Sequence, residues 1–103
     1  MSDEVAVEPA PALRTRFTDL VGVRYPIVQT GMGWVAGSHL VTATAKAGGL
    51  GILASATMTL DELKRQIAEV RTATDAPFGV NLRTDVADVE QRIAAMVQSI
   101  IHI

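Results

Sequence analysis

The sequence predicts an α/β protein built from parallel β-α units. Three short apolar segments of strand length alternate with three longer segments that have helical periodicity. The apolar segments begin near residues 27, 51 and 78, and intervals of 24 and 27 residues are typical of a strand, a crossover helix and the next parallel strand. This pattern is compatible with a doubly wound open sheet and with part of a barrel of eight such units.

The amino-terminal segment precedes this alternation. Residues 1–12 contain Ser, Asp, Glu, Pro and Ala, so they have little to bury and are expected to form a mobile leader. Residues 13–103 are expected to form one domain, because a chain of 103 residues holds at most one. At the start of that domain, residues 14–21 are predicted to form a short helix or turn with one apolar face.

The first strand, at residues 27–30, runs directly into a turn that contains two glycines. Ile27 and Val28 are apolar and predict a buried strand. Glycine has no Cβ, so a flat ligand can approach the main chain of the turn closely. Because ligands of α/β proteins bind at the carboxyl ends of strands, we interpret this turn as the lip of a cofactor site. The lip consists of Gln29, Thr30, Gly31, Met32 and Gly33.

A helix and a second strand follow the lip. Residues 38–47 have helical spacing, and Gly48 with Gly49 is expected to end this helix as a carboxyl-terminal cap. Residues 50–55 form a continuous apolar run, as expected of a strand that is covered on both faces. The inner residues predicted for the helix are Leu40, Val41, Ala45 and Ala47.

The clearest amphipathic helix begins at a capping box. Thr59 is expected to accept a hydrogen bond from the amide of Glu62, and Glu62 from the amide of Thr59. The residues that follow repeat at helical spacing, with charged side chains on the opposite face. The inner residues predicted for this helix are Leu60, Leu63, Ile67 and Val70.

The last predicted elements are a strand, a helix and the start of a further strand. Residues 78–82 are predicted to form the third strand, and Thr84 or Asp85 to cap the third of the crossover helices. Residues 100–103 are expected to open a fourth strand. The inner residues predicted for the helix are Val86, Val89, Ile93, Met96 and Val97.

Composition excludes several classes of function. A net charge of −2 and a pI near 5.5 provide no basic surface for nucleic acid or an anionic membrane. No apolar run approaches the roughly 18 residues that span a bilayer. Cys is absent, so neither a disulfide framework nor a thiolate metal site is expected, and we predict no metal site. We expect a cytoplasmic protein that acts on a small-molecule substrate.

Four sequence motifs follow one another along the chain. They are YPIVQTGMGWVAG at residues 25–37, AGGLGILASATM at 47–58, TLDEL at 59–63 and PFGVNL at 77–82. In this order they resemble the amino-terminal part of the nitronate monooxygenases, formerly called 2-nitropropane dioxygenases. The resemblance covers most of the chain and implies a TIM-type (β/α)8 barrel, incomplete in this chain, which supplies only the three amino-terminal units. Unpaired strands at both ends then predict aggregation or a homo-oligomer.

The resemblance implies FMN as cofactor, and it implies that residues 13–103 are a partial FMN-binding barrel domain. In this family the main chain of the first turn contacts the reactive edge of the flavin, and an Asn after the third strand reaches its pyrimidine. The second contact falls on Asn81, whose amide has both a donor and an acceptor for it. A neighbouring backbone loop is the alternative partner of this amide. The first contact falls on Gln29, Thr30, Gly31, Met32 and Gly33, while Ala54 and Ser55 are placed at the same mouth.

The resemblance also implies an activity. It indicates an FMN-dependent oxidoreductase that oxidises nitronates or related carbanion-like substrates with O2. One alternative is an FMN-dependent reductase or ring-catabolic enzyme that acts on acyl thioesters. The other is an inactive, truncated half-barrel that only oligomerises. The family's catalytic His and phosphate-binding loops follow the fourth strand, beyond Ile103, so no catalytic residue is assigned.

This chain differs from many family members in its first turn, and two further residues, one aromatic and one basic, are given structural roles. Many family members have Ala-Pro-Met-Ala in the first turn, where this chain has Thr30 to Gly33, and the difference bears on the substrate more than on the flavin. Trp34 is expected to pack under the turn, and His39 to lie at the surface in the first turn of a helix.

Overall fold

The computed structural model describes residues 13–100 and confirms the predicted α/β class. Its strands form one open, parallel sheet in the order β1-β2-β3. The predicted leader at residues 1–12 and residues 101–103 lie outside the described part of the chain. The elements are α1 (Arg16–Val21), β1 (Val28–Gln29), α2 (Ser38–Ala47), β2 (Leu50–Leu53), the 3-10 helix η2 (Ser55–Thr57), α3 (Leu60–Ala73), β3 (Phe78–Val80) and α4 (Val89–Ile100).

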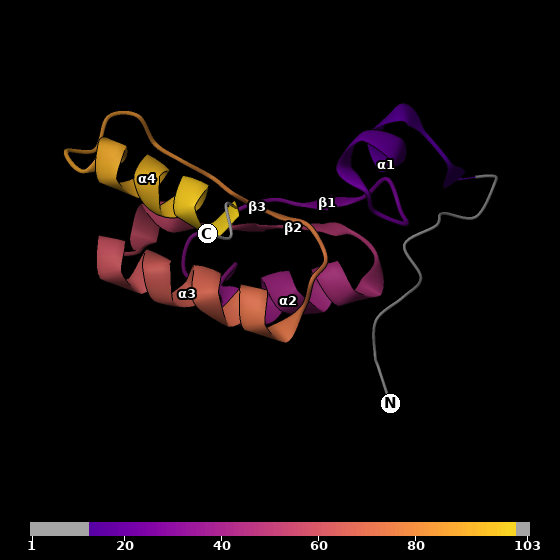
Figure 1. Ribbon diagram of the computed structural model, residues 1–103, viewed down its shortest axis with the longest axis horizontal. Coiled ribbons are helices and arrows are strands. Elements are labelled where there is room, and N and C mark those ends of the chain that lie inside the picture. The colour runs from indigo at the N-terminus through magenta and orange to yellow at the C-terminus, as the bar shows by residue number, and fades with distance from the viewer. Residues whose placement is uncertain (1–12, 101–103) are drawn as a thin grey trace.

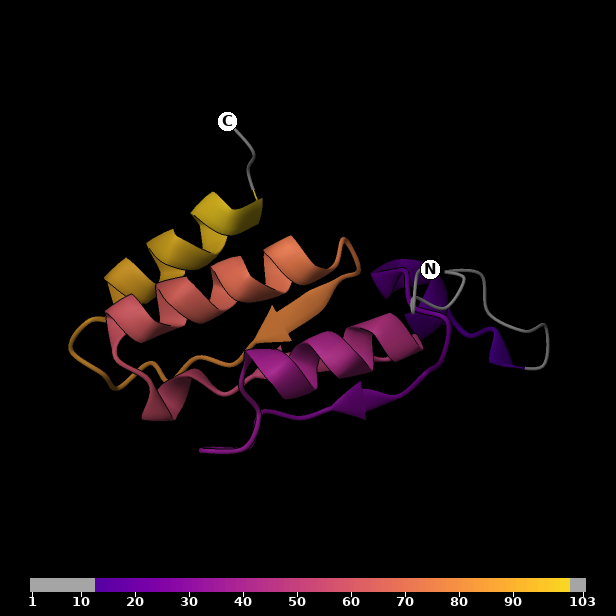
Figure 2. The same ribbon diagram turned by 90° about the horizontal axis from the view of Figure 1, so that it is seen from below.

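Helices α2 and α3 form a layer on one face of the sheet, and α4 lies on the outer side of α3 (Figures 1 and 2). Helix α2 packs on β2 and on α3, and α4 packs on α3. The short helix α1 lies beyond the amino ends of the strands (Figure 1). This arrangement is the one that right-handed crossovers produce between parallel strands. The carboxyl ends of all three strands therefore lie at the end of the sheet that is far from α1.

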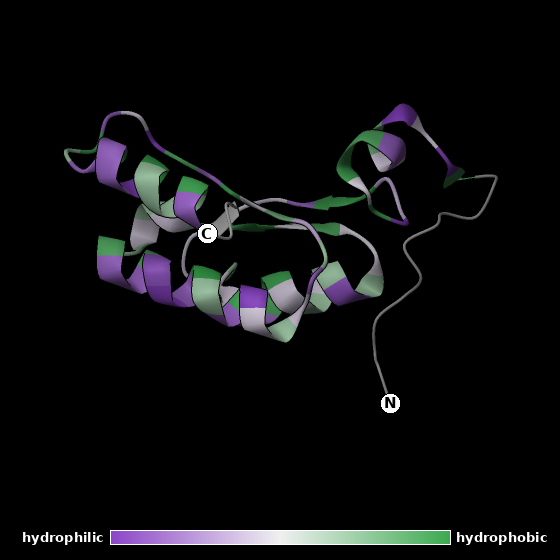
Figure 3. Ribbon diagram, viewed as in Figure 1, coloured by the Kyte–Doolittle hydropathy of each residue, from purple (hydrophilic) through white to green (hydrophobic). Residues whose placement is uncertain are grey.

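The hydrophobic core lies between the sheet and the helix layer. In α3 the residues Leu63, Ile67 and Val70 are buried, as their spacing predicts, while Leu60 is half-buried. Polar residues gather on the outer surface of α3, and the strands are predominantly apolar (Figure 3). The largest buried cluster consists of Val41, Leu53, Met58, Leu63, Ile67 and Val70.

The predicted burial of two strands is wrong. Ile27 is 61% exposed and Val28 41% exposed, because β1 is an edge strand and no described element covers its second face. The strand β2 ends at Leu53, before Ala54 and Ser55. Burial alternates along β2, with Leu53 fully buried and Ile52 half-buried. A layer of helices on one face only accounts for this alternation.

The predicted ends of the last helix are also wrong. Helix α4 begins at Val89, after a turn in which the Asp85 carboxylate binds Arg83 at 2.6 Å. Because that carboxylate is engaged, it does not cap the helix. Ile100 is the last residue of α4 and does not open a strand. Ile93 is 45% exposed, although its spacing predicts an inner position, because no described element packs on that side of α4.

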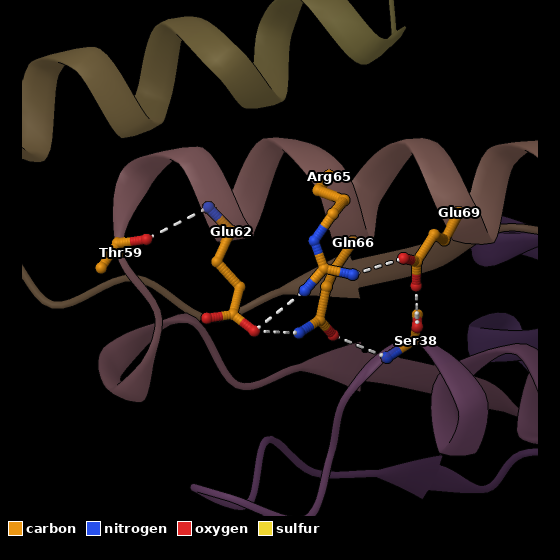
Figure 4. Close-up of polar contacts among 6 residues, drawn as sticks. All are labelled: Ser38, Thr59, Glu62, Arg65, Gln66 and Glu69. Carbon is orange, nitrogen blue, oxygen red and sulfur yellow. Dashed lines mark hydrogen bonds and ion pairs between the residues drawn. The ribbon is translucent and has the colours of Figure 1, made fainter.

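The helix ends follow local signals. Gly48 ends α2 with φ of 101°, a left-handed conformation that favours glycine, as predicted. The Thr59 hydroxyl accepts a hydrogen bond from the Glu62 amide at 3.2 Å, which is one half of the predicted capping box. The Glu62 carboxylate turns instead to Arg65 and Gln66, from which it accepts hydrogen bonds at 3.1 and 3.2 Å (Figure 4).

A polar network joins the start of α2 to the outer face of α3 (Figure 4). The Ser38 amide donates to Gln66 Oε1 at 2.8 Å, and the Ser38 hydroxyl donates to the Glu69 carboxylate. Arg65 binds Glu69 at 2.6 Å and also binds Glu62. Gly37, which precedes α2, forms no side-chain cap, so Gln66 supplies an acceptor that the helix itself lacks.

This network predicts an acid-sensitive contribution to stability. The hydrogen bond from Ser38, helped by the positive charge of Arg65, lowers the pKa of Glu69 below its usual 4.5. A lowered pKa in the folded state stabilises the fold above the ordinary value, and this contribution is lost as the pH falls through the lowered value. We therefore expect Glu69→Gln to flatten the dependence of the melting temperature on pH below about pH 5.

The matched variant is Ser38→Ala, which removes the main cause of the shift and keeps the carboxylate. It is expected to flatten the same part of the curve, measured by thermal unfolding across a pH series. Identical slopes in the wild type and in both variants would show that the network does not couple protonation to folding.

Candidate functional site

The carboxyl ends of the three strands bring four predicted site residues together. Gly31 follows β1, Ala54 and Ser55 follow β2, and Asn81 follows β3. Main-chain hydrogen bonds hold these segments side by side, because the Asn81 amide donates to the Leu53 carbonyl at 3.0 Å. The loops that follow the three strands therefore lie together at the carboxyl end of the sheet.

Asn81 is oriented by Ser55. The Ser55 amide donates to Asn81 Oδ1 at 2.7 Å, and the Ser55 hydroxyl donates to the Asn81 carbonyl at 2.5 Å. Asn81 is exposed and lies just after β3, which ends at Val80, so the predicted extension of this strand to residue 82 is wrong. The acceptor of the amide is thus satisfied by a backbone loop, the alternative partner. Among residues 13–100, Nδ2 has no hydrogen-bond partner.

Gly31 is packed against that free donor. A Cβ built on Gly31 would lie 2.4 Å from Asn81 Nδ2 and 3.5 Å from the Ala54 Cα. The φ of Gly31 is not positive, so glycine is required here for space and not for conformation. The main chain of the first turn and the amide of Asn81 therefore form one contact surface.

The side chain of Gln29 links the first turn to the neighbouring elements. Its Nε2 donates to the Ile52 carbonyl at 3.2 Å, and its Oε1 accepts from the Thr44 hydroxyl at 3.4 Å. A further bond, from Nε2 to the Thr30 carbonyl at 2.5 Å, lies within the lip, so this side chain holds the lip against β2 and α2. Thr30, Met32 and Gly33 are exposed at the rim. The roles of the lip residues in holding a cofactor stay predictions.

Trp34 stands out from the lip and does not pack under it. Its side chain is 88% exposed, and its φ of 66° lies in the left-handed region that a bulky residue rarely adopts. The turn is held by hydrogen bonds from the Val35 and Ala36 amides to the Met32 carbonyl, at 3.0 and 2.7 Å. The residue that is buried under the turn is Ala36.

Arg92 is a site-related residue that was not predicted. It lies on α4, is 7% exposed, and donates to the carbonyls of Ser55 at 2.8 Å and Met58 at 2.6 Å. Its Nε also binds Asp88 at 2.8 Å. A signal was available in the sequence, because residue 92 falls on the same helical face as Met96, where an apolar residue is expected.

One polar group of the strand-end surface has the chemistry that a flavin would need. At Gly31 the space of the missing Cβ is taken by the Asn81 side chain, so the amide lies directly against the main chain of the first turn. The Nδ2 donor of Asn81 matches the carbonyl acceptors of a flavin pyrimidine. Among residues 13–100 no group of three or more His, Asp or Glu is placed to hold a metal ion. In the same described segment, no helix is both long enough and apolar enough to cross a membrane.

An open parallel sheet with crossover helices places this chain among the α/β proteins, whose ligands bind at the carboxyl ends of the strands. The family model that matches this chain, over residues 14–102, is that of nitronate monooxygenase. The chain belongs to this family.

The curated relatives include two types of enzyme. One type is named (3aS,4S,5R,7aS)-5-hydroxy-7a-methyl-1-oxo-octahydro-1H-indene-4-carboxyl-CoA dehydrogenase. The protein of that name from Mycobacterium tuberculosis is 63% identical over 84% of this chain, and the one from Rhodococcus jostii is 57% identical over 88%. The nitronate monooxygenase of Pseudomonas aeruginosa is 43% identical over 65% of this chain. The chain spans 24%, 26% and 19% of these three relatives, respectively.

A solved structure agrees with the fold described above. The structure of FabK from Thermotoga maritima matches with a TM-score of 0.80 and 38% sequence identity. The match covers 85% of this chain and 28% of that one. The open three-stranded sheet therefore corresponds to part of a longer protein of the same architecture.

Proposed function

We propose that the full-length protein is an FMN-dependent oxidoreductase that dehydrogenates a coenzyme A thioester carrying a fused-ring system. The observation that carries the proposal is the contrast in identity. The two dehydrogenases named for an indene-carboxyl-CoA are 63% and 57% identical to this chain, and the nitronate monooxygenase from P. aeruginosa is 43% identical. This substrate class is the acyl-thioester alternative that the sequence leaves open.

The described residues would contribute binding and orientation of the cofactor. The main chain at Gly31 would lie along the ring edge, and Asn81 Nδ2 would donate to a pyrimidine carbonyl. Ser55 would hold the amide in the orientation that presents this donor. Bound FMN would supply the capacity to take up two electrons and a proton from the substrate.

Oxidation of a nitronate with O2 is the second candidate. It is favoured by the family model, which carries the name nitronate monooxygenase over residues 14–102. A further named nitronate monooxygenase, a probable one from Staphylococcus saprophyticus, is 40% identical over 68% of this chain.

Anaerobic reduction of the bound cofactor separates the two candidates. The full-length protein is loaded with FMN and mixed, without O2, with a hydroxylated hydrindanone-carboxyl-CoA or with propyl nitronate. We expect the thioester to bleach the yellow flavin absorbance, and the nitronate to do so at least about 100-fold more slowly, which corresponds to roughly 2.7 kcal/mol of activation free energy.

The matched control is the same ring carboxylic acid without coenzyme A. If the thioester is recognised, the free acid is expected to leave the flavin oxidised. Rapid bleaching by the nitronate alone would establish the second candidate, and failure of the protein to bind FMN would contradict both.

A further inference from the structure

The buried guanidinium of Arg92 lies outside the predicted lip yet contacts the segment that supports it. It donates three hydrogen bonds to oxygen atoms: one to Asp88 on its own helix, and one each to the carbonyls of Ser55 and Met58 after β2. Burial of a positive charge is unfavourable unless the charge is paired and hydrogen-bonded. An apolar residue would fill this position of α4 without that cost. The role of this buried charge is therefore sought in the groups that Arg92 contacts.

The contacts continue from Arg92 to the candidate site. Ser55, whose carbonyl accepts from Arg92, holds both the side chain and the main chain of Asn81. Asn81 in turn presents Nδ2 beside Gly31. Arg92 is thus connected through Ser55 to the only donor of this amide that is free within the described residues. Its hydrogen bonds go to Asp88, Ser55 and Met58, which lie outside the lip.

We propose that Arg92 is a positioning residue for the flavin site, acting through Ser55 to fix the orientation of the Asn81 amide. The inference rests on the proposed binding of FMN at the strand ends. The planar fork of arginine makes two carbonyl bonds and one carboxylate bond at once, which the point charge of lysine does not reproduce. Outer-shell residues of this kind typically alter ligand affinity through the groups that they orient.

The first readout needs no cofactor. In the full-length apo-protein, Arg92→Gln and the milder Arg92→Lys are expected to increase amide hydrogen exchange at Ser55 by about tenfold or more, because its bond to Asn81 Oδ1 is loosened. Exchange at Val41, in the core of α2, serves as the internal reference. Unchanged exchange at Ser55 in a folded variant would overturn the proposal.

The second readout is the dissociation constant of FMN, followed by flavin fluorescence in a double-mutant cycle. We expect Arg92→Lys to raise this constant about tenfold in the wild-type background and to have no further effect in an Asn81→Ala background. The control is Arg65→Gln on the outer face of α3, which removes exposed ion pairs and is expected to leave the constant unchanged.

The outcomes separate the inference from the function on which it rests. Equal losses of affinity in both backgrounds would show that Arg92 supports the fold in general and not the amide of Asn81. If the wild-type protein binds FMN but the double-mutant cycle shows no coupling between residues 92 and 81, the positioning role alone is overturned. A wild-type protein that does not bind FMN would overturn both the positioning role and the proposed function.

Discussion

Substitution of Gly51 by alanine is expected to destabilise the protein by about 2–3 kcal/mol, the effect of forcing an extra methyl group into a well-packed core. A Cβ at this position would lie 2.8 Å from the Val41 carbonyl oxygen and 3.0 Å from the Val41 Cα. Both atoms belong to the backbone of α2, which cannot move without shifting the whole helix. The strand β2 and the helix α2 therefore approach each other as closely as they do because residue 51 has no side chain.

Gly79→Ala is the matched control, since Gly79 lies on the neighbouring strand β3. A Cβ there would meet only the side chain of Ile52, at 3.3 Å from Cγ1, and this side chain can adjust. We expect a change within about 0.5–1 kcal/mol, because alanine also reduces the entropy of the unfolded chain. The free energies of unfolding are measured by urea denaturation of the full-length protein. Equal effects of the two substitutions would contradict the close approach of α2 to β2.

Substitution of Asn81 by aspartate is expected to raise the dissociation constant of FMN by about 10- to 100-fold, the loss of one or two good hydrogen bonds. Aspartate keeps an oxygen that accepts from the Ser55 amide, so the loop geometry is retained. It replaces Nδ2, the donor proposed for the flavin, with a second acceptor. The melting temperature of the apo-protein is therefore expected to change little while the affinity falls.

Asn81→Ala extends this comparison. It removes both the donor and the acceptor, so it is expected to weaken FMN binding and also to lower the melting temperature, since the Ser55 amide loses its partner. Fluorescence titration and thermal unfolding of the same preparations distinguish the two effects. If the aspartate variant binds FMN as tightly as the wild type, Nδ2 is not a donor to the cofactor.

Much of the fold was predictable because it depends on local interactions. The helix at residues 38–47 was predicted with the bounds that the structure shows, and its end at Gly48 follows from a conformation that glycine adopts without strain. The start of α3 at Thr59 depends on a side chain and an amide three residues apart. Such signals lie within one turn of the chain, so they are visible without knowledge of the tertiary structure.

Burial of the strands was less predictable. The apolar character of Ile27 and Val28 predicts burial, yet both are exposed because nothing described covers their side of the edge strand. Covering depends on the elements that pack against a strand and not on its own residues. The start of α4 was also misplaced, because the pairing of Asp85 with Arg83 competes with capping.

The alternation of strands and helices, the family resemblance, and a glycine turn followed later by an Asn can all be recognised in the sequence. How these parts meet follows from the packing of the folded chain. Ser55 and Asn81 are 26 residues apart, and Ser55 and Arg92 are 37 residues apart, yet hydrogen bonds connect them. These contacts depend on the parallel register of β2 and β3 and on where α4 returns to the sheet. A pattern of neighbouring residues reports local conformation, whereas a site of this kind is assembled by packing between distant segments.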